Sequence, residues 1–262
     1  MRAIYKPRGR AREYAPLAVN LYAGCPHGCL YCYAPACLRR ERNDFHRAAN
    51  PRDGILDALE RDAKRISAKS ESTGPVLLCF SCDPYPRGCD TQTTREAIDI
   101  LGRCGFKVSV LTKNPDAARR DFDLFGKYDV EFGVSLIWSN DESRKQWEPN
   151  AGHIVERVAA LTHASEHGIR TWCSVEPVID PLQAYHVVRS MRPWVNVWKL
   201  GAWNHDARAK AIDYARFLCA LMPLLREAED KKGAAYAIKN DLWAHASEST
   251  KREFSQKSEE IK

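Results

Sequence analysis

The sequence lacks any run of 18 or more apolar residues, roughly the length that a helix needs to cross a bilayer. Its basic N-terminus also lacks the apolar segment of a secretory signal. Solenoid-type repeats and low-complexity linkers are missing too. These absences exclude a membrane-spanning, secreted or solenoid protein. They predict a cytoplasmic protein that has no membrane partner.

The composition suits a folded domain with reactive thiols. The chain has 262 residues, of which 44% are apolar, so it can bury a core as one large domain or two small ones. Its ten cysteines are not expected to form disulfides in a reducing compartment, which leaves metal binding or burial. Seven cysteines fall into two groups, at positions 25, 29, 32 and 37 and at positions 79, 82 and 89. Cys104, Cys173 and Cys219 are scattered, and core packing suits them.

The formal net charge is +6, and part of the excess is clustered. Basic residues gather in the first 16 residues, which we treat as a basic N-terminal arm, and again at 39–42. Such clusters can neutralise the phosphates of DNA or RNA, although a solvated basic surface has the same pattern.

Strand-like and helix-like runs alternate along residues 17–245. Helices are expected to begin at Asn50-Pro51, at a Thr93–Glu96 capping box, at Asn114-Pro115, at His153 and near Asp206. The predicted strands are Leu17–Tyr22, Val76–Ser81, Lys107–Thr112, Val130–Leu136, Arg170–Val175 and Val195–Leu200. This alternation predicts an α/β fold, an open partial (β/α)6 TIM-like barrel with its chemistry at the carboxyl ends of the strands. The polar residues 246–262 are expected to form a disordered tail.

The first cysteine group has the spacing C-x3-C-x2-C over Cys25, Cys29 and Cys32, directly after the first predicted strand. Three thiolates can hold three irons of a four-iron cube and leave the fourth iron open to a chelating ligand. A structural zinc site is the alternative, with His27 or Cys37 as the fourth ligand. Three unliganded buried thiols are a poor fit to a loop that contains Gly24, Pro26 and Gly28.

This cysteine spacing, with Tyr31 before the last cysteine, resembles the signature of the radical SAM superfamily. Within it, residues from about 20 to 181 are similar to the spore photoproduct lyase group, also described as DNA repair photolyase-like. The resemblance rests on Gly24-Cys25, Tyr31-Cys32-Tyr33, Ser81-Cys82-Asp83-Pro84-Tyr85, Leu111-Thr112-Lys113, Val134-Ser135, Trp147-Glu148-Pro149 with Arg157, and Glu176-Pro177-Val178-Ile179.

The resemblance implies a 4Fe–4S cluster held by Cys25, Cys29 and Cys32, with S-adenosylmethionine on the open iron. Reductive cleavage of the cofactor would give methionine and a 5′-deoxyadenosyl radical, so an electron donor such as flavodoxin or ferredoxin is an expected partner. Tyr31 and Tyr33 are candidates for relaying a hydrogen atom, and ordinary packing is their alternative.

The resemblance also implies a cofactor-binding set at the strand ends. It consists of Tyr33, Ser81, Cys82, Asp83, Lys113, Ser135, Glu148, Arg157 and Glu176. Carboxylates and hydroxyls suit the ammonium and ribose groups of the cofactor, and a lysine suits its carboxylate. Asp83 could instead cap a turn, and Glu148 and Arg157 could pair with each other.

The sequence departs from the lyase pattern at Phe80, where the lyases carry a hydrogen-donating cysteine. Cys79 is adjacent but should point to the opposite face of a strand, so Cys82 or Cys89 would have to serve as a donor. A cluster of Trp194, Trp198, Lys199, Trp203, Asn204 and His205 could stack on a base or pack in the core.

The resulting hypothesis is a radical SAM enzyme that acts on nucleic acid, as a lesion lyase or a base modifier. One alternative is a radical SAM enzyme that acts on a peptide or small metabolite. The other is a non-catalytic zinc or iron–sulfur module. The sequence leaves open the substrate, the fate of the cofactor and the oligomeric state.

Overall fold

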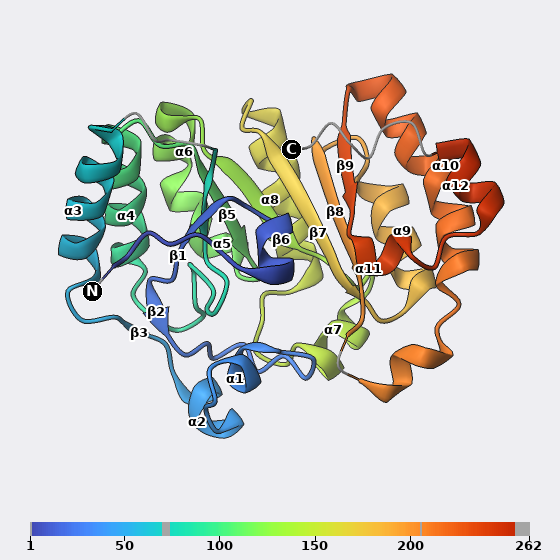
Figure 1. Cartoon of the computed structure of the whole chain (residues 1–262), viewed down its shortest axis with the longest axis horizontal. Coiled ribbons are helices and arrows are strands. Elements are labelled where there is room, and N and C mark those ends of the chain that lie inside the picture. The colour runs from blue at the N-terminus through green and yellow to red at the C-terminus, as the bar shows by residue number, and fades with distance from the viewer. Residues whose placement is uncertain (1, 70–73, 205, 255–262) are drawn as a thin grey trace.

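The structure is a computed structural model that describes residues 2–69, 74–204 and 206–254. Its main sheet has seven parallel strands in the order β1-β4-β5-β6-β7-β8-β9 and curls into a half-barrel (Figure 1). The strands are β1 Leu17–Val19, β4 Val76–Leu78, β5 Val108–Thr112, β6 Glu131–Ser135, β7 Thr171–Val178, β8 Val197–Ala202 and β9 Ala235–Ile238. Each strand pairs with the one before it in the chain, as repeated βαβ crossovers produce.

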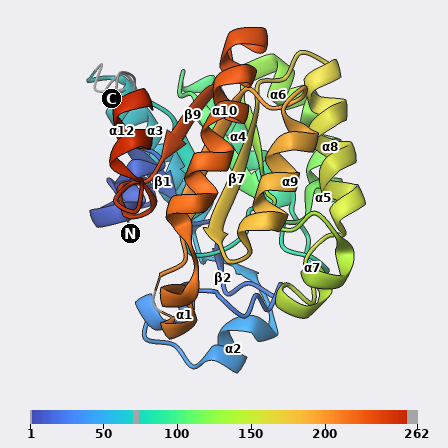
Figure 2. The same ribbon diagram turned by 90° about the vertical axis from the view of Figure 1, so that its right-hand side faces the viewer.

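Helices cover the outer face of the sheet (Figures 1 and 2). They are α3 Ile55–Ser67, α4 Gln92–Arg103, α5 Pro115–Ala118, α6 Phe122–Tyr128, α7 Asp141–Trp147, α8 Ile154–Glu166, α9 Pro181–Met191 and α10 Tyr214–Lys232, with α11 Asn240–Trp243 and α12 Glu248–Phe254 at the end. The cysteine segment adds α1 Ala34–Cys37, α2 Arg42–Arg47 and a small antiparallel ladder, β2 Tyr22–Ala23 with β3 Asn50–Pro51. None of the described helices combines the length and apolar character that crossing a membrane requires.

The predicted partial barrel is confirmed, and each of the six predicted strands overlaps an observed one. The seventh strand, β9, was missed because it has only four residues and lies at the edge of the sheet. Three helix starts were also wrong, one of them near Asp206, because a 3-10 helix, η3 Ala207–Ala211, comes first and α10 begins only at Tyr214. Asn50-Pro51 pairs as β3, so α3 begins only after the left-handed Gly54, and no side chain caps α4. The predicted start at His153 is correct, since a capping box with Glu156 begins α8.

The N-terminal segment packs against the barrel. It crosses the face of the sheet that the helices leave uncovered (Figure 1). Tyr5 forms an antiparallel bridge with Ala18, and the backbone amides of Ala3 and Ile4 donate to the Asp62 carboxylate at 2.8 and 3.2 Å. The 3-10 helix η1 (Gly9–Glu13) follows and brings Tyr14 over the inside of the barrel. The segment that the sequence marks as a basic arm is therefore part of the folded unit.

The expected disorder of the C-terminal tail is wrong for Glu248–Phe254, which forms α12. Phe254 is buried, the Arg226 guanidinium lies 4.5 Å from the centre of its ring, and Arg226 also donates to the Glu253 carbonyl. The prediction relied on average polarity, but one aromatic residue is enough to anchor a helix of this length. Residues 255–262 lie outside the described part of the chain.

The concave side of the sheet has its own small core of Ala15, Ala18, Leu77 and Trp172. Trp172 on β7 lies flat against Gly133 on β6. A Cβ atom at residue 133 would come within 2.1 Å of the indole. Glycine is therefore required there to let the large ring lie close to the neighbouring backbone.

We expect Gly133→Ala to lower the free energy of unfolding by about 1–3 kcal/mol, because the added methyl group has to displace Trp172. Gly126→Ala is the matched control. Gly126 is exposed in α6 with no atom within 4 Å of its added Cβ, so alanine there should stabilise by up to about 1 kcal/mol. Urea denaturation followed by circular dichroism measures both. Equal effects of the two changes would contradict the packing of Trp172 on β6.

Candidate active site

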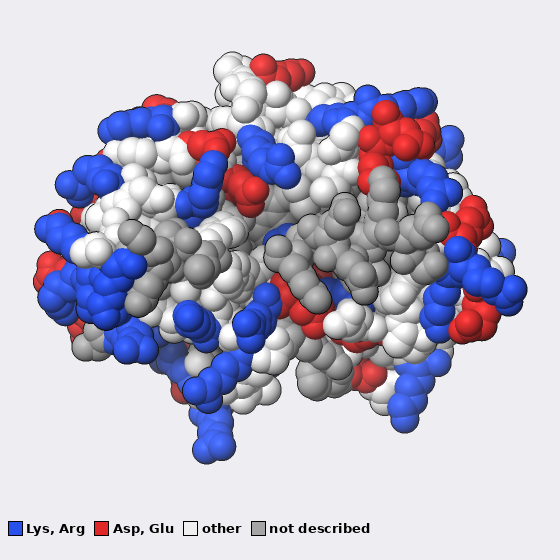
Figure 3. Space-filling view, turned by 45° about the horizontal axis from the view of Figure 1, so that its top comes forward, with Lys and Arg blue, Asp and Glu red and all other residues white. Residues whose placement is uncertain are grey.

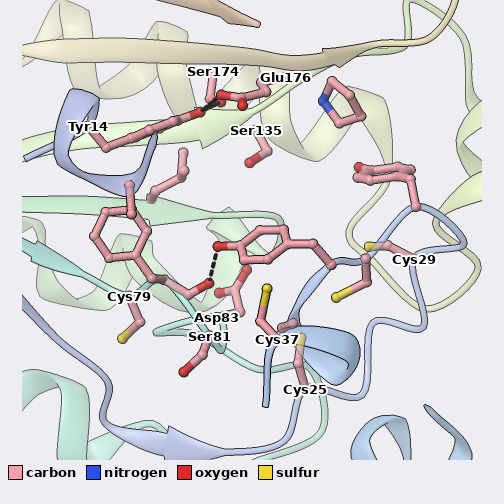
Figure 4. Close-up of a pocket in the computed structure, with 18 of the residues that line it drawn as sticks. Tyr14, Cys25, Cys29, Cys37, Cys79, Ser81, Asp83, Ser135, Ser174 and Glu176 are labelled. Carbon is pink, nitrogen blue, oxygen red and sulfur yellow. Dashed lines mark hydrogen bonds between the residues drawn. The ribbon is translucent and has the colours of Figure 1, made fainter. Parts of the chain in front are cut away.

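A cavity of about 430 Å³ lies at the carboxyl ends of the strands, on the concave side of the sheet (Figure 4). Five parts of the chain form its wall. They are the N-terminal segment, the cysteine loop, the residues after β4, the ends of β5 to β8, and Lys239 after β9. Each strand delivers its last residues to the same edge because all the strands are parallel.

The cysteine loop is held in place from both sides. Gly24 has a φ of +89°, and a Cβ there would meet the Ala48 carbonyl oxygen at 2.1 Å, so only glycine allows the loop to pass α2. The Cys25 amide donates to the Phe45 carbonyl at 3.0 Å. The Arg42 guanidinium donates to the carbonyls of Cys29 and Cys32.

Cys25, Cys29 and Cys32 all border the cavity as free thiols. Burial raises the pKa of Cys25 well above its usual range, that of Cys29 to about 12, and that of Cys32. The thiols therefore stay protonated until a metal ion binds the sulfur atoms and displaces the protons.

The geometry does not favour a single zinc ion. In the described part of the chain, no three His, Cys, Asp or Glu side chains converge closely enough to hold one metal ion. The thiolates of a cluster bind separate irons, so they do not have to converge. His27 is an unsuitable fourth ligand because its Nε2 accepts from the Arg87 amide at 3.3 Å and its Nδ1 lies 3.5 Å from the Asp83 carboxylate.

Asp83 joins the ends of two strands. Its carboxylate accepts hydrogen bonds from the Thr112 hydroxyl at 2.6 Å and from the amides of Lys113 and Tyr85, each at 2.8 Å. Asp83 therefore caps a turn, which was the alternative role given to it, and it also borders the cavity. A cofactor contact through its remaining acceptor capacity stays a prediction.

Lys113 is a cation without an anionic partner. It borders the cavity, and its ammonium lies 5.6 Å from the centre of the Tyr31 ring. Among the described residues, no carboxylate lies within ion-pair distance of it. Burial lowers the pKa of Lys113, but nearby acidic groups, the Glu148 and Asp83 carboxylates among them, raise it, so the net pKa is raised and the charge is kept. Such a cation favours an anionic ligand.

Glu148 and Arg157 pair with each other, as the alternative reading expected. Both side chains are fully buried, and a guanidinium nitrogen lies 2.6 Å from the carboxylate. Arg157 also donates to the Ser135 carbonyl at 2.9 Å, and the Tyr31 hydroxyl donates to Glu148. Neither side chain borders the cavity, so the pair positions Tyr31 and Ser135 from behind the wall.

Of the proposed hydrogen-atom carriers, Tyr33 is the more open. It is 51% exposed, and its hydroxyl donates to the Phe80 carbonyl at 2.8 Å. Tyr31 is half-buried, and desolvation together with Glu148 raises its pKa well above the usual range. Both tyrosines border the cavity.

The residues after β4 also border the cavity, from Cys79 through Asp83, with Ser81 and Cys82 among them. Cys79 packs in the main apolar core, and its sulfur points away from the middle of the cavity in Figure 4, as expected, although β4 itself ends at Leu78. Cys79 and Cys82 have C-x2-C spacing. Burial and the Cys82 thiol raise the pKa of Cys79 well above its usual range.

Glu176 was predicted beside adenine or substrate, and the structure places it in the cavity wall between two unexpected partners. The Tyr14 hydroxyl donates to it at 2.6 Å, and the Lys239 ammonium lies 2.7 Å from its other oxygen. No sequence motif marks Tyr14, and Lys239 follows β9, the strand that was not predicted.

The proposed aromatic cluster is divided. Trp203 and Asn204 border the cavity, whereas Trp198 is in the core and His205 lies outside the described residues.

Basic and acidic side chains are unevenly spread on the face shown in Figure 3. Lysines and arginines gather on the left, both charges mix on the right, and a hollow lies between the two sides. Arg8 borders the cavity, and Arg12, Arg39 and Arg40 are exposed in segments that contribute other residues to its wall.

A parallel half-barrel with a cavity, a few converging polar side chains and three free thiols at its carboxyl edge is the architecture of a cofactor-dependent enzyme. A sequence model described as the radical SAM superfamily matches residues 19–191, and the chain belongs to this superfamily. Membership implies S-adenosylmethionine and an iron–sulfur cluster as cofactors. The residues present fit both groups, because the thiols share one cavity wall with the unpaired ammonium of Lys113.

Among curated proteins, the chain is 26% identical over 188 residues to an uncharacterised protein of Methanocaldococcus jannaschii, covering 70% of this chain and 69% of that protein. It is 28% identical over 173 residues to an uncharacterised protein of Mycobacterium tuberculosis, covering 63% of this chain and only half of the mycobacterial protein.

Two solved structures show the same fold. Spore photoproduct lyase complexed with a dinucleoside spore photoproduct matches with a TM-score of 0.68 at 14% identity, covering 89% of this chain and 80% of that one. SuiB of Streptococcus suis bound to its precursor peptide SuiA matches with a TM-score of 0.60 at 12% identity, covering 87% and 50%. Similarity at this low sequence identity supports a shared fold but does not identify the substrate.

We expect Arg157→Met to lower the free energy of unfolding by about 3–5 kcal/mol, because it leaves the Glu148 carboxylate buried without its counter-ion. Adding Glu148→Gln should recover most of that loss, since an amide still accepts from Tyr31 and carries no charge. Urea denaturation of the single and double variants measures the difference. A single variant as stable as the wild type would contradict the buried pair.

Proposed function

We propose that this chain reductively cleaves S-adenosylmethionine at a 4Fe–4S cluster held by Cys25, Cys29 and Cys32, giving methionine and a 5′-deoxyadenosyl radical. We propose further that the radical acts on nucleic acid, in a lesion lyase or base-modifying reaction. One observation carries the first part. The three thiols of one short loop share the wall of an enzyme-like cavity with the unpaired ammonium of Lys113.

Three thiolates leave one iron of a cube without a protein ligand, which is where a chelating amino acid could bind. When bound, the cluster supplies the electron that breaks a carbon–sulfur bond, and that chemistry belongs to the cofactor. The chain supplies orientation and exclusion of water. In this proposal Lys113 pairs with the cofactor carboxylate, and Ser135 holds a ribose or carboxylate oxygen.

The residues after β4 complete the proposed cofactor site. Ser81, Cys82 and Asp83 would face the cofactor ammonium, while Tyr33 would lie beside the cofactor. Glu148 and Arg157 would act through Tyr31 and Ser135 because they lie behind the wall.

Charge supports the nucleic-acid substrate. The basic N-terminal segment contributes Arg8 to the cavity wall, and Arg39 and Arg40 are exposed just after the cysteine loop. These side chains could neutralise phosphates near the site of reaction. Binding to nucleic acid would then weaken steeply as salt concentration rises. A peptide or small metabolite as substrate would show a much smaller dependence on salt.

The cleavage reaction is tested by anaerobic reconstitution with iron and sulfide, reduction, addition of S-adenosylmethionine and detection of 5′-deoxyadenosine by mass spectrometry. The wild type should form the product. Cys29→Ala should form none, because two thiolates rarely retain a cube. Cys37→Ala is the matched control and should keep both cluster and product, since Cys37 borders the same cavity but lies outside the C-x3-C-x2-C motif.

Zinc without sulfide in the wild type, or a normal four-iron cluster in Cys29→Ala, would contradict the assignment of the ligands. Loss of the cluster in Cys37→Ala would indicate a fourth protein thiolate, which leaves no open iron.

We expect Lys113→Met to weaken S-adenosylmethionine binding roughly tenfold or more, the usual effect of losing a charge-assisted hydrogen bond. Lys107→Met is the control. Lys107 lies just before the same strand, is 62% exposed and pairs with Asp129. Equilibrium dialysis of the reconstituted proteins gives the affinities, and iron and sulfide analysis confirms equal cluster content. An unchanged affinity in Lys113→Met would remove the proposed role of Lys113.

A further inference from the structure

A second polar surface borders the cavity across from the cysteine loop. It consists of Arg8, Tyr14, Ser174, Glu176 and Lys239, and we call it the arm-side wall. Figure 4 shows Tyr14, Ser174 and Glu176 on one side of the cavity and the cysteine loop on the other. The five residues come from the N-terminal segment, β7 and the turn after β9, so folding gathers them from nearly the full length of the chain.

The arm-side wall is tightly ordered. The Tyr14 hydroxyl donates to Glu176 and shares a second hydrogen bond with the Ser174 hydroxyl, each at 2.6 Å. The Lys239 ammonium lies 2.7 Å from Glu176 and 4.1 Å from the centre of the Tyr14 ring. Lys239 is 9% exposed and Glu176 20%, so this ion pair is largely withdrawn from bulk solvent while it borders the cavity.

Gly201 makes room for the Glu176 carboxylate. A Cβ at residue 201 would lie 2.7 Å from the Glu176 carboxyl carbon. The backbone of β8 therefore approaches the acidic side chain more closely than any other residue would permit.

Stability alone does not explain this arrangement. The desolvation cost of a buried ion pair usually offsets its Coulomb attraction, and apolar residues of similar size would hold the barrel as well. The charge of the wall is also unbalanced, since it holds two basic residues, Arg8 and Lys239, and one carboxylate, Glu176. Arg8 has no ion-pair partner among the described residues. Behind Tyr14, the Lys199 ammonium donates to the Tyr14 carbonyl at 2.7 Å and adds another cation.

We propose that the arm-side wall is a substrate subsite that binds an anionic group, with Arg8 and Lys239 as the anchoring cations and Tyr14 and Glu176 holding Lys239 in place. This inference rests on the proposed function, under which the anionic group is the phosphate of a nucleotide. A cavity of about 430 Å³ must also hold the cofactor. The cavity is therefore too small for a double helix, so in this proposal the nucleotide enters unpaired.

The test compares two probes that differ only in charge. One is thymidylyl-thymidine, which carries a single phosphodiester, and the other is its uncharged methylphosphonate analogue. Their affinities are measured by anaerobic equilibrium dialysis with the reconstituted protein in the presence of S-adenosylmethionine. The wild type should bind the charged probe roughly tenfold more tightly, as expected for a charge-assisted contact.

Lys239→Gln and Arg8→Gln should each remove most of this preference, and Lys239→Arg should restore it. Lys64→Gln is the control and should keep the preference, because Lys64 is 68% exposed on α3 and pairs with Glu60. All variants should keep their affinity for S-adenosylmethionine. If Lys239→Gln does not fold, Arg8→Gln decides, because Arg8 is exposed and makes no ion pair in the described part of the chain.

Equal affinity of the wild type for the two probes would overturn the proposal, and so would an undiminished preference in Arg8→Gln. Tighter binding of an acidic tripeptide than of the charged probe would overturn the assignment to a nucleotide. Failure of the wild type to form 5′-deoxyadenosine would count against the proposed function, not against this binding result. Normal cleavage without a phosphate preference would count against the subsite alone.

Discussion

The parallel hydrogen-bond ladder of the main sheet is the constraint on which the rest of the structure depends. Because the strands run in one direction, polar residues far apart in the sequence meet at one edge. Asp83 then strengthens this edge with two hydrogen bonds that join the loop after β4 to the end of β5, and it accepts a third from the Tyr85 amide of its own loop. The cysteine loop and Lys113 face the same cavity only because this edge is held in register.

A half-barrel leaves its concave face uncovered, and the N-terminal segment covers it. Tyr14 packs on Trp172 and Phe80, while Lys199 holds the Tyr14 carbonyl. Desolvation lowers the pKa of Lys199 to about 8, because loss of water around an ammonium disfavours its charged form. The N-terminal segment, which composition alone describes as basic and exposed, thus has two roles. Its apolar side closes the barrel, and its polar side chains line the cavity.

Local patterns predicted the features that depend on local sequence. Apolar runs located six strands, and cysteine spacing located the loop, because both signals lie within a few adjacent residues. The partner of a polar side chain is a tertiary property. The sequence left open whether Glu148 and Arg157 contact a ligand or each other. Both side chains are buried behind Tyr31 and do not border the cavity, so they form an ion pair with each other. Tyr14 and Lys239 belong to no sequence motif, so their contacts with Glu176 could not be predicted. The helix α12 is anchored by the buried Phe254, but the average polarity of the segment predicted disorder.

The cavity draws its wall from residue 8 to residue 239, and this span has a consequence during protein synthesis. The cysteine loop is complete at Cys32, but Glu176 and Lys239 leave the ribosome only after most of the chain has been made. Until then the thiols have no closed pocket around them and are open to oxygen. A metal loaded before the last strands dock would thus bind at an unprotected site. Delivery of the metal to the completely folded protein is therefore favoured.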